Sequence, residues 1–269
     1  MIKHTFGITQ EPFHREQIEL LSQQKQAFDI IKIHSQHGGF SVIIGRPGVG
    51  KTVLRQQIEM LNKERDCVVV SVSHTMHTYL NILKQLAESL KLEVSMHHLE
   101  KEIIGAAFQA VQERKALYTL IDEAHLLEMS VLRKLRLLFE RFPKKHNLVL
   151  FGQPELLYHL SMTVNADIKS RITYSHTLVG LNDEDMTQVI LTELDAVGLG
   201  HNTFDEAAIE LILRQAQGNL RLCRNLCYGS LVDACRDGTR TVLTRHVNSV
   251  LVQPHWRSHE ELIKQQLAS

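Results

Sequence analysis

The sequence predicts an α/β fold in which a five-stranded parallel sheet lies between helices and is followed by a small all-helical domain. From Gly39 onward, short apolar runs alternate with longer amphipathic segments, as in parallel strands joined by helices. A glycine-rich stretch, GRPGVGKT, joins the first apolar run to the first amphipathic segment. Beyond residue 180 the amphipathic segments continue without apolar runs of strand length. These three observations indicate a three-layer domain followed by a helical one.

Each element of the first domain follows from its own pattern. The runs FSVIIG, CVVVSV, LYTLID and LVLFG consist mainly of apolar residues, which favours buried strands. With a weaker fifth run, the predicted strands cover residues 40–45, 67–72, 117–122, 148–152 and 173–178. The segments between them repeat apolar residues at helical spacing and predict helices over 51–63, 78–91, 98–114 and 129–142. Five strands suit one compact sheet.

The second domain is predicted from helical spacing alone. Its expected helices cover residues 183–198, 205–216, 219–236 and 244–251, and Asn182 or Asp183 can cap the first of them. A tail follows that begins at Pro254 and carries the single tryptophan, Trp256. The expected organisation is an N-terminal segment 1–38, the α/β domain 39–179, the helical domain 180–253 and the tail 254–269.

Composition excludes several classes of protein. The 269 residues include 30 Lys and Arg and 30 Asp and Glu, so any contact with a polyanion must come from a local patch or a multimer. The four cysteines are too few for a disulfide framework and lack paired zinc spacing. Neither a signal peptide nor a run of 18 apolar residues occurs, so a soluble, cytoplasmic protein without a membrane span is expected.

GRPGVGKT fits the pattern G-x-x-x-x-G-K-[ST], the P-loop or Walker A motif. Its glycines allow a tight turn whose N–H groups converge on phosphates, next to the positive end of a helix. Lys51 is expected to reach the β and γ phosphates of ATP, and the Thr52 hydroxyl is expected to bind Mg²⁺. The expected nucleotide contacts are Gly45, Pro47, Gly48, Val49, Gly50, Lys51, Thr52 and Val53.

LYTLIDEAH supplies the second half of a nucleotide site, the Walker B motif. Asp122 at the end of an apolar strand is expected to hold Mg²⁺, and Glu123 is expected to polarise the attacking water. Capping of the next helix is the alternative role for this acidic pair. The letters DEAH also occur in helicases, but those enzymes need two lobes of the P-loop type, and the helical segment after residue 180 cannot supply the second.

Three further polar residues lie at the edges of predicted elements. Gln153 follows the fourth strand and can orient the attacking water, or it can simply begin the helix at Pro154. Arg171 precedes the fifth strand and Arg221 begins a helix of the second domain. On their own, both arginines fit ordinary solvated charge.

Taken in order, TFGITQEPF, GRPGVGKT, LIDEAH, FGQPEL, SRI and GNLRLCRNLC resemble the AAA+ ATPases. Within that family they resemble the group that contains ExeA-like secretion ATPases and the transposition regulators TniB, TnsC and MuB. The resemblance implies a P-loop AAA+ core with a helical lid, and ATP bound between neighbours of a hexameric ring or a helical filament. It also implies that Arg171 reaches the next subunit's γ phosphate and that Arg221 senses phosphates in its own subunit.

The resemblance also places the N-terminal segment. By analogy, FGITQEPF is expected to pack near the adenine, with Phe6, Pro12 and Phe13 providing apolar surface. Packing of this segment on the α/β core, without contact with a nucleotide, is an equally good alternative.

The two branches of the group differ in purpose. ExeA-like proteins continue into a membrane span and a peptidoglycan-binding region, whereas this sequence stops at Ser269 with neither. The expectation is therefore an ATP-dependent regulator of DNA transposition that oligomerises on duplex DNA and recruits or activates a transposase. ATP hydrolysis then controls disassembly. The alternative is an ExeA-like secretion or envelope-assembly ATPase that acts with a membrane partner.

Two stretches are candidates for contact with DNA phosphates. One follows the second strand, and the other, RKLRLLFERFPKKH, is a basic amphipathic segment whose alternative role is an ordinary solvated helix face. The predicted DNA contacts are Thr75, His77, Thr78, Lys84, Arg133, Lys134, Lys144 and Lys145, with Arg136 and Arg141 in the same segment. A multimer repeats such a weak patch, so a neutral subunit is compatible with DNA binding.

Overall fold

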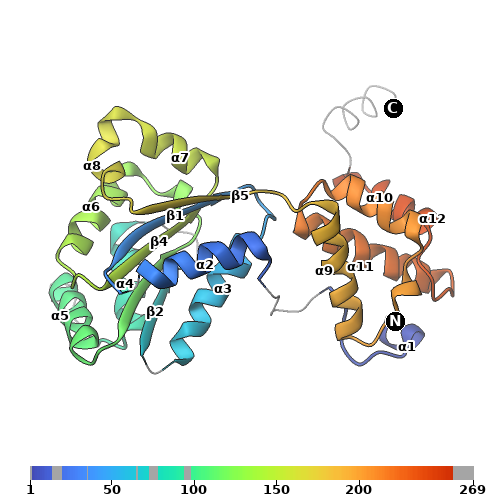
Figure 1. Cartoon of the computed structure of the whole chain (residues 1–269), viewed down its shortest axis with the longest axis horizontal. Coiled ribbons are helices and arrows are strands. Elements are labelled where there is room, and N and C mark those ends of the chain that lie inside the picture. Colours follow the sequence, from blue (N-terminus) through green and yellow to red (C-terminus); the bar gives the residue numbers. More distant parts are fainter. Residues whose placement is uncertain are drawn as a thin grey trace. The chain divides into compact units, whose positions relative to one another are not determined.

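The computed structural model describes residues 2–13, 20–34, 36–64, 66–72, 78–93 and 98–256. The chain forms two compact units, an α/β unit of residues 19–178 and a helical unit that combines residues 1–18 with 179–269 (Figure 1). The expected N-terminal segment 1–38 is therefore not one piece of the structure. Its first half belongs to the helical unit and its second half to the α/β unit.

The α/β unit is built on a parallel sheet of five strands in the order β2-β3-β4-β1-β5. The strands are β1 (Gly39–Gly45), β2 (Cys67–Val72), β3 (Ala116–Ile121), β4 (His146–Gly152) and β5 (Tyr174–Leu178). All five predicted strands are confirmed, with ends that differ by at most two residues. Because β4 lies between β1 and β3, the carboxyl ends of these three strands lie side by side at one edge of the sheet.

Helices cover both faces of this sheet. Successive side chains of β1 show the division: Ile43 packs with α2 and α3, whereas Val42 and Ile44 pack in the cluster formed with α4 to α8. The helices are α2 (Ser22–His34), α3 (Lys51–Met60), α4 (Tyr79–Ser89), α5 (Leu99–Gln112), α6 (Met129–Glu140), α7 (Pro154–Ser161) and α8 (Ala166–Lys169). A 3₁₀ turn at Leu61–Lys63 extends α3 to the predicted end of its helix. The helix α2 was not predicted.

The helical unit contains α1 (Ile2–Phe6), α9 (Asp183–Ala196), α10 (Glu206–Ala216), α11 (Leu220–Arg236) and α12 (Thr244–Leu251). Asn182 caps α9 by accepting a hydrogen bond from the N–H of Asp185 at 2.6 Å, so the first of the two predicted caps is the one used. Asn219 caps α11 in the same way. The four predicted helices are confirmed. Among the described residues, no helix combines the length and the apolar character needed to cross a bilayer.

The beginning of the chain packs within the helical unit. Helix α1 contacts α11, and the buried ring of Phe13 lies edge-on against Phe204, with centroids 6.2 Å apart. The N–H of Phe13 donates to the buried carboxylate of Glu193 at 3.2 Å. Part of the apolar surface expected of this segment is therefore used for packing within the helical unit. Its position near an adenine stays a prediction.

A buried histidine stands at the start of β4. His146 stacks on Phe139 at 4.7 Å between ring centroids, and its Nε2 lies 2.9 Å from Thr119 Oγ1. Burial lowers the pKa of His146 from 6.5 to about 3, because the charged imidazolium loses its hydration. The ring is therefore neutral in the folded protein at physiological pH.

This histidine predicts a pH dependence of stability. Between pH 6.5 and about 3, the unfolded chain takes up a proton at His146 that the folded chain does not. Stability is fully present above 6.5 and falls with pH below it, by about 1.4 kcal/mol per pH unit. His146→Phe should flatten this slope, measured as urea unfolding between about pH 7 and about pH 5. His98→Phe, at an exposed site, should keep it. An unchanged slope in His146→Phe would contradict the assignment.

Candidate functional site

The loop between β1 and α3 has the geometry that GRPGVGKT predicts. Gly48 and Gly50 have φ of 83° and 98°, which side-chain-bearing residues rarely adopt. A Cβ at Gly45 would lie 2.6 Å from Val49 Cγ2, so the tight turn also requires glycine there. Gly50 is the N-cap of α3, whose N-terminal end faces into the loop. A loop of this kind presents backbone N–H groups to an anion.

Gln24 of α2 supports this loop from outside the motif. A Cβ at Gly50 would lie 2.0 Å from Gln24 Nε2, so the amide packs against the glycine backbone. Its Oε1 accepts from the N–H of Leu21 at 2.9 Å, which fixes the orientation of the amide. Gln24 is buried, at 1% exposure. Sequence reasoning missed this residue together with α2, although the buried positions Gln24, Ala27 and Ile31 have helical spacing.

Lys51 begins α3 and turns its amine back into the loop. The side chain is buried, and Nζ donates to the carbonyl oxygens of Gly45 at 2.6 Å and Arg46 at 3.1 Å. Thr52, the next residue, is exposed. The structure thus brings together a cation, a hydroxyl and a helix N-terminus, as expected for the phosphate-binding part of the site.

Asp122 and Glu123 follow β3 at the same edge of the sheet. The N–H of Asp122 extends the ladder to Val72 O at 3.2 Å, and Asp122 Oδ1 accepts from the N–H of Glu123 at 2.9 Å. Glu123 has a φ of 48°, a left-handed conformation that costs a non-glycine residue about 1–3 kcal/mol and is concentrated at functional sites.

The conformation of Glu123 leaves its carboxylate half exposed, with Oε2 3.3 Å from His125 Nδ1. Glu123 precedes the 3₁₀ turn Ala124–Leu126, but its side chain makes no cap hydrogen bond. The alternative role as a helix cap is therefore not used by this side chain.

Gln153 follows β4, between the strands that carry the P-loop and the acidic pair. Gly152, the residue before it, pairs with Ile44 of β1, which puts Gln153 level with the end of β1. Gln153 is the N-cap residue of α7, and its side chain makes no cap hydrogen bond. The side-chain amide therefore does not cap α7, and its role in orienting the attacking water stays a prediction.

The oxygen atoms at this edge fit Mg²⁺ bound together with a nucleotide. The Thr52 hydroxyl and the Asp122 carboxylate are hard ligands, and the ion pair between Arg55 and Asp122 links the helix that carries Thr52 to Asp122. Within the described residues, no cluster of three or more His, Cys, Asp or Glu is suited to a metal ion. Mg²⁺ commonly binds one or two carboxylates together with substrate phosphates. A metal here therefore needs phosphate oxygens to complete its ligands.

Sequence reasoning missed Arg55, which contacts the predicted metal ligand. Arg55 Nε lies 3.1 Å from Asp122 Oδ2, and both side chains are mostly buried. Arg55 stands four residues after Lys51 on α3, so the two residues share a face of the helix. This spacing was the signal in the sequence by which Arg55 could have been found.

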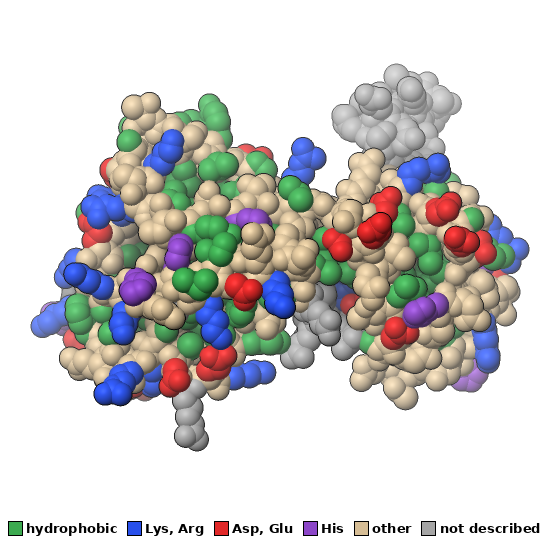
Figure 2. Space-filling model, viewed as in Figure 1, with side chains coloured by type: hydrophobic (Ala, Val, Ile, Leu, Met, Phe, Trp, Pro, Cys, Tyr) green, Lys and Arg blue, Asp and Glu red, His purple; other side chains and the backbone are tan. Residues whose placement is uncertain are grey.

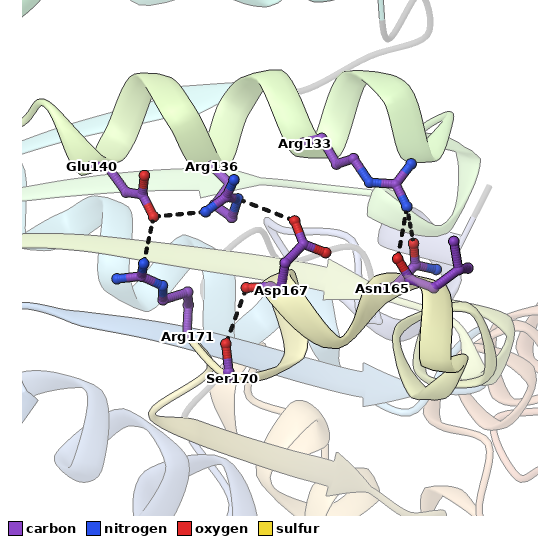
Figure 3. Close-up of polar contacts among 8 residues, drawn as sticks. Arg133, Arg136, Glu140, Asn165, Asp167, Ser170 and Arg171 are labelled. Carbon is purple, nitrogen blue, oxygen red and sulfur yellow. Dashed lines mark hydrogen bonds and ion pairs between the residues drawn. The ribbon is translucent and has the colours of Figure 1, made fainter.

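Arg171 lies at the opposite edge of the sheet. The N–H of Thr173 bonds to Phe40 O at 2.8 Å, so the residues before β5 lie beside the start of β1, far from the P-loop at its end. Arg171 Nη2 lies 3.0 Å from Glu140 Oε1, which also accepts from Arg136 (Figure 3). The arginine is 57% exposed and lines a cavity of about 340 Å³. It is accessible to a neighbouring molecule.

Arg221 belongs to the other structural unit. It follows the first residue of α11, as predicted, and is exposed. Its proposed contact with phosphates in the same subunit depends on how the two units are placed, and it stays a prediction.

The predicted DNA contacts after β2 are partly described. Thr75 and His77 lie outside the described residues. Thr78 is the N-cap of α4, and its hydroxyl accepts from the N–H of Asn81 at 3.4 Å. Lys84 is exposed on the same helix.

The second basic segment is divided between internal and exposed side chains. Arg133 donates to Asn165 Oδ1 at 2.6 Å and to Val164 O at 3.0 Å, which ties α6 to the turn after α7 (Figure 3). Lys134 Nζ lies 5.7 Å from the centre of the Tyr79 ring. Arg136 and Arg141 form ion pairs with Glu140 and Glu100. Lys134, Lys144 and Lys145 are exposed, and their predicted contact with DNA stays a prediction.

Comparison with known proteins agrees with this geometry. Residues 33–160 match the family model described as an AAA domain. General secretion pathway protein A of Aeromonas hydrophila is 25% identical over 256 residues, which cover 90% of this chain and 46% of that protein. The chain thus spans less than half the length of this relative.

Solved structures show the same fold at low sequence identity. The ORC2 protein of Aeropyrum pernix has a TM-score of 0.69 at 16% identity, covering 93% of this chain and 71% of that one. Cdc6p of Pyrobaculum aerophilum has a TM-score of 0.67 at 19% identity, covering 97% and 73%. The RuvB motor of Thermotoga maritima has a TM-score of 0.60 at 14% identity, covering 92% and 76%. The chain is therefore similar to an AAA domain over residues 33–160, and it has the P-loop AAA+ fold with a helical C-terminal region.

Proposed function

We propose that the protein is a Mg²⁺-dependent ATPase. The observation that carries this proposal is the convergence of the P-loop, the acidic pair and Gln153 at the carboxyl ends of three adjacent strands. Lys51 and the loop N–H groups hold the phosphates, and Thr52 and Asp122 hold Mg²⁺, which neutralises charge on the phosphates when bound. Glu123 accepts a proton from the attacking water, and Gln153 orients that water.

The active form is proposed to be a homo-oligomer, a hexameric ring or a helical filament. Arg171 and the P-loop lie at opposite ends of β1, and the five residue steps from Phe40 to Gly45 span about 16 Å. Arg171 therefore suits the ATP of a neighbouring subunit better than its own. A head-to-tail contact of this kind closes into a ring or continues as a helix, depending on its rotation.

The oligomer is proposed to assemble on duplex DNA and to recruit or activate a transposase. Structures with the same fold support DNA as the partner, including the Aeropyrum pernix ORC1 protein in complex with DNA and Drosophila ORC bound to DNA. Figure 2 shows basic and acidic side chains interspersed over the visible face. Such a surface fits weak contacts with DNA that are repeated by each subunit of an oligomer. Lys84, Lys144 and Lys145 are exposed candidates for these contacts.

A second function has an observation of its own. The relative named General secretion pathway protein A matches 90% of this chain at 25% identity, which favours a role in secretion with a membrane partner. The AAA domain serves both hypotheses, so the partner distinguishes them.

The two functions predict different responses of the ATPase rate. In the DNA-bound assembly, hydrolysis per subunit should rise steeply with protein concentration and several-fold with added duplex, because each junction completes a site. The measurement is phosphate release across a protein titration, with and without duplex, and with Lys144→Ala and Lys145→Ala combined. Dependence on concentration alone, with indifference to duplex, would favour secretion. A rate near zero in every arm would contradict the ATPase itself.

A further inference from the structure

Arg55 connects three elements beside the predicted metal site. Its Nε lies 3.1 Å from Asp122 Oδ2, and its Nη1 donates to Ser71 Oγ on β2 at 3.1 Å and to Glu59 on α3. The Arg55 side chain is 14% exposed and that of Asp122 is 18% exposed. A cation is therefore held against the one carboxylate that is expected to hold Mg²⁺.

The contact with Asp122 is electrostatic and not a directed hydrogen bond. The N–H of Arg55 Nε is buried and has no acceptor in hydrogen-bond alignment, although Oδ2 lies within ion-pair distance. The guanidinium is held instead by its hydrogen bonds to Ser71 and Glu59. Arg55 can therefore keep its position while Asp122 replaces the guanidinium with a divalent cation as its partner.

Arg55 and a divalent cation compete for the Asp122 carboxylate, because both are positively charged. Partial burial strengthens the attraction between Arg55 and Asp122, and it equally strengthens the repulsion between Arg55 and a divalent cation on the same carboxylate. The proposed protein ligands of the metal are the Asp122 carboxylate and the Thr52 hydroxyl. Those two ligands are a weak set for Mg²⁺ unless phosphate oxygens join them.

We infer that Arg55 is an internal counter-ion of Asp122 that keeps free divalent cations off this carboxylate, so that metal enters the site together with a nucleotide. The inference rests on the proposed function, and it adds a positioning residue that acts on the metal site through Asp122. The consequence is that the protein without nucleotide binds free metal ions weakly but binds the metal–nucleotide complex.

Mn²⁺ alone, without nucleotide, tests this inference. Arg55→Gln should bind Mn²⁺ about tenfold more tightly than the wild-type protein, because a repelling unit charge is removed from the site. The measurement is the free Mn²⁺ signal in electron paramagnetic resonance. The gain should disappear in Arg55→Gln combined with Asp122→Asn, which assigns it to this carboxylate. Arg55→Lys should bind as weakly as wild type, because the positive charge remains.

Two further variants make the test decisive. Arg141→Gln is the matched control, because it removes a more exposed ion-paired arginine and changes the net charge equally. Arg55→Met keeps the unbranched stem of the side chain, and it is used in place of Arg55→Gln if the glutamine variant does not fold. A structural defect would loosen Mn²⁺ binding, so unchanged or weaker binding in folded Arg55→Gln or Arg55→Met would overturn the inference.

The proposed function is checked separately. Binding of a fluorescent ADP analogue to the wild-type protein, measured with Mg²⁺ present, reports whether the P-loop takes a nucleotide. Failure of that binding would count against the ATPase. The Mn²⁺ result would still decide whether Arg55 shields Asp122.

Discussion

Replacing Lys51 with alanine should reduce ATP affinity at least about 100-fold. The amine sits buried inside the loop and donates to the carbonyl oxygens of Gly45 and Arg46, so it is already placed where the phosphates are expected. A hydrogen bond to a charged group contributes about 1.5–3 kcal/mol, and two such bonds to phosphate oxygens account for the loss. Titration with a fluorescent ATP analogue measures it directly.

The fold of Lys51→Ala should survive without nucleotide. Alanine removes a partly desolvated charge and preserves the helix start, so the thermal midpoint should stay close to that of the wild-type protein. Lys84→Ala, which removes an exposed lysine from the same unit, is the control and should bind ATP normally. Retention of ATP affinity within a few-fold in Lys51→Ala would remove the P-loop from the account.

The order of strands and helices was predictable because each pattern is local. Residues 244–251 were predicted as helix from apolar spacing alone, and α12 spans Thr244–Leu251. Helix α2 was missed because Ser22–His34 begins with five polar residues, and its buried face becomes visible only when α3 packs beside it. The division of residues 1–38 between two units likewise depends on distant partners such as Phe204.

The candidate site also divides into residues that were predictable from the sequence and residues that were not. The P-loop is a contiguous motif, so its glycines and Lys51 were predictable from one short stretch. The pairing of Arg55 with Asp122 and of Arg171 with Glu140 joins residues on different elements, and only the packing of the sheet and helices brings them together. The left-handed conformation of Glu123 has no sequence signal either, because glutamate seldom adopts it.

The other large effect is expected from Glu123→Gln, which should bind ATP and hydrolyse it about 100-fold to 10,000-fold more slowly. Glutamine keeps the size of the side chain but cannot accept the proton of the attacking water. Because ATP then persists at the junctions, assemblies should also persist and should be visible by sedimentation. Glu128→Gln, an exposed glutamate just before α6, is the matched control and should turn over normally. Normal turnover in Glu123→Gln would show that another group is the base.

Mixing two inactive variants extends this prediction to the arrangement of subunits. Arg171→Ala keeps Glu123, and Glu123→Gln keeps Arg171, so a junction between the two variants can combine an intact base with an intact arginine. If Arg171 acts on the neighbour's nucleotide, the mixture should regain a substantial fraction of wild-type hydrolysis, although each variant alone is slow. If Arg171 acted within its own subunit, or only held Glu140 in place, no mixture would recover activity. The distance between Arg171 and the P-loop along β1 favours recovery.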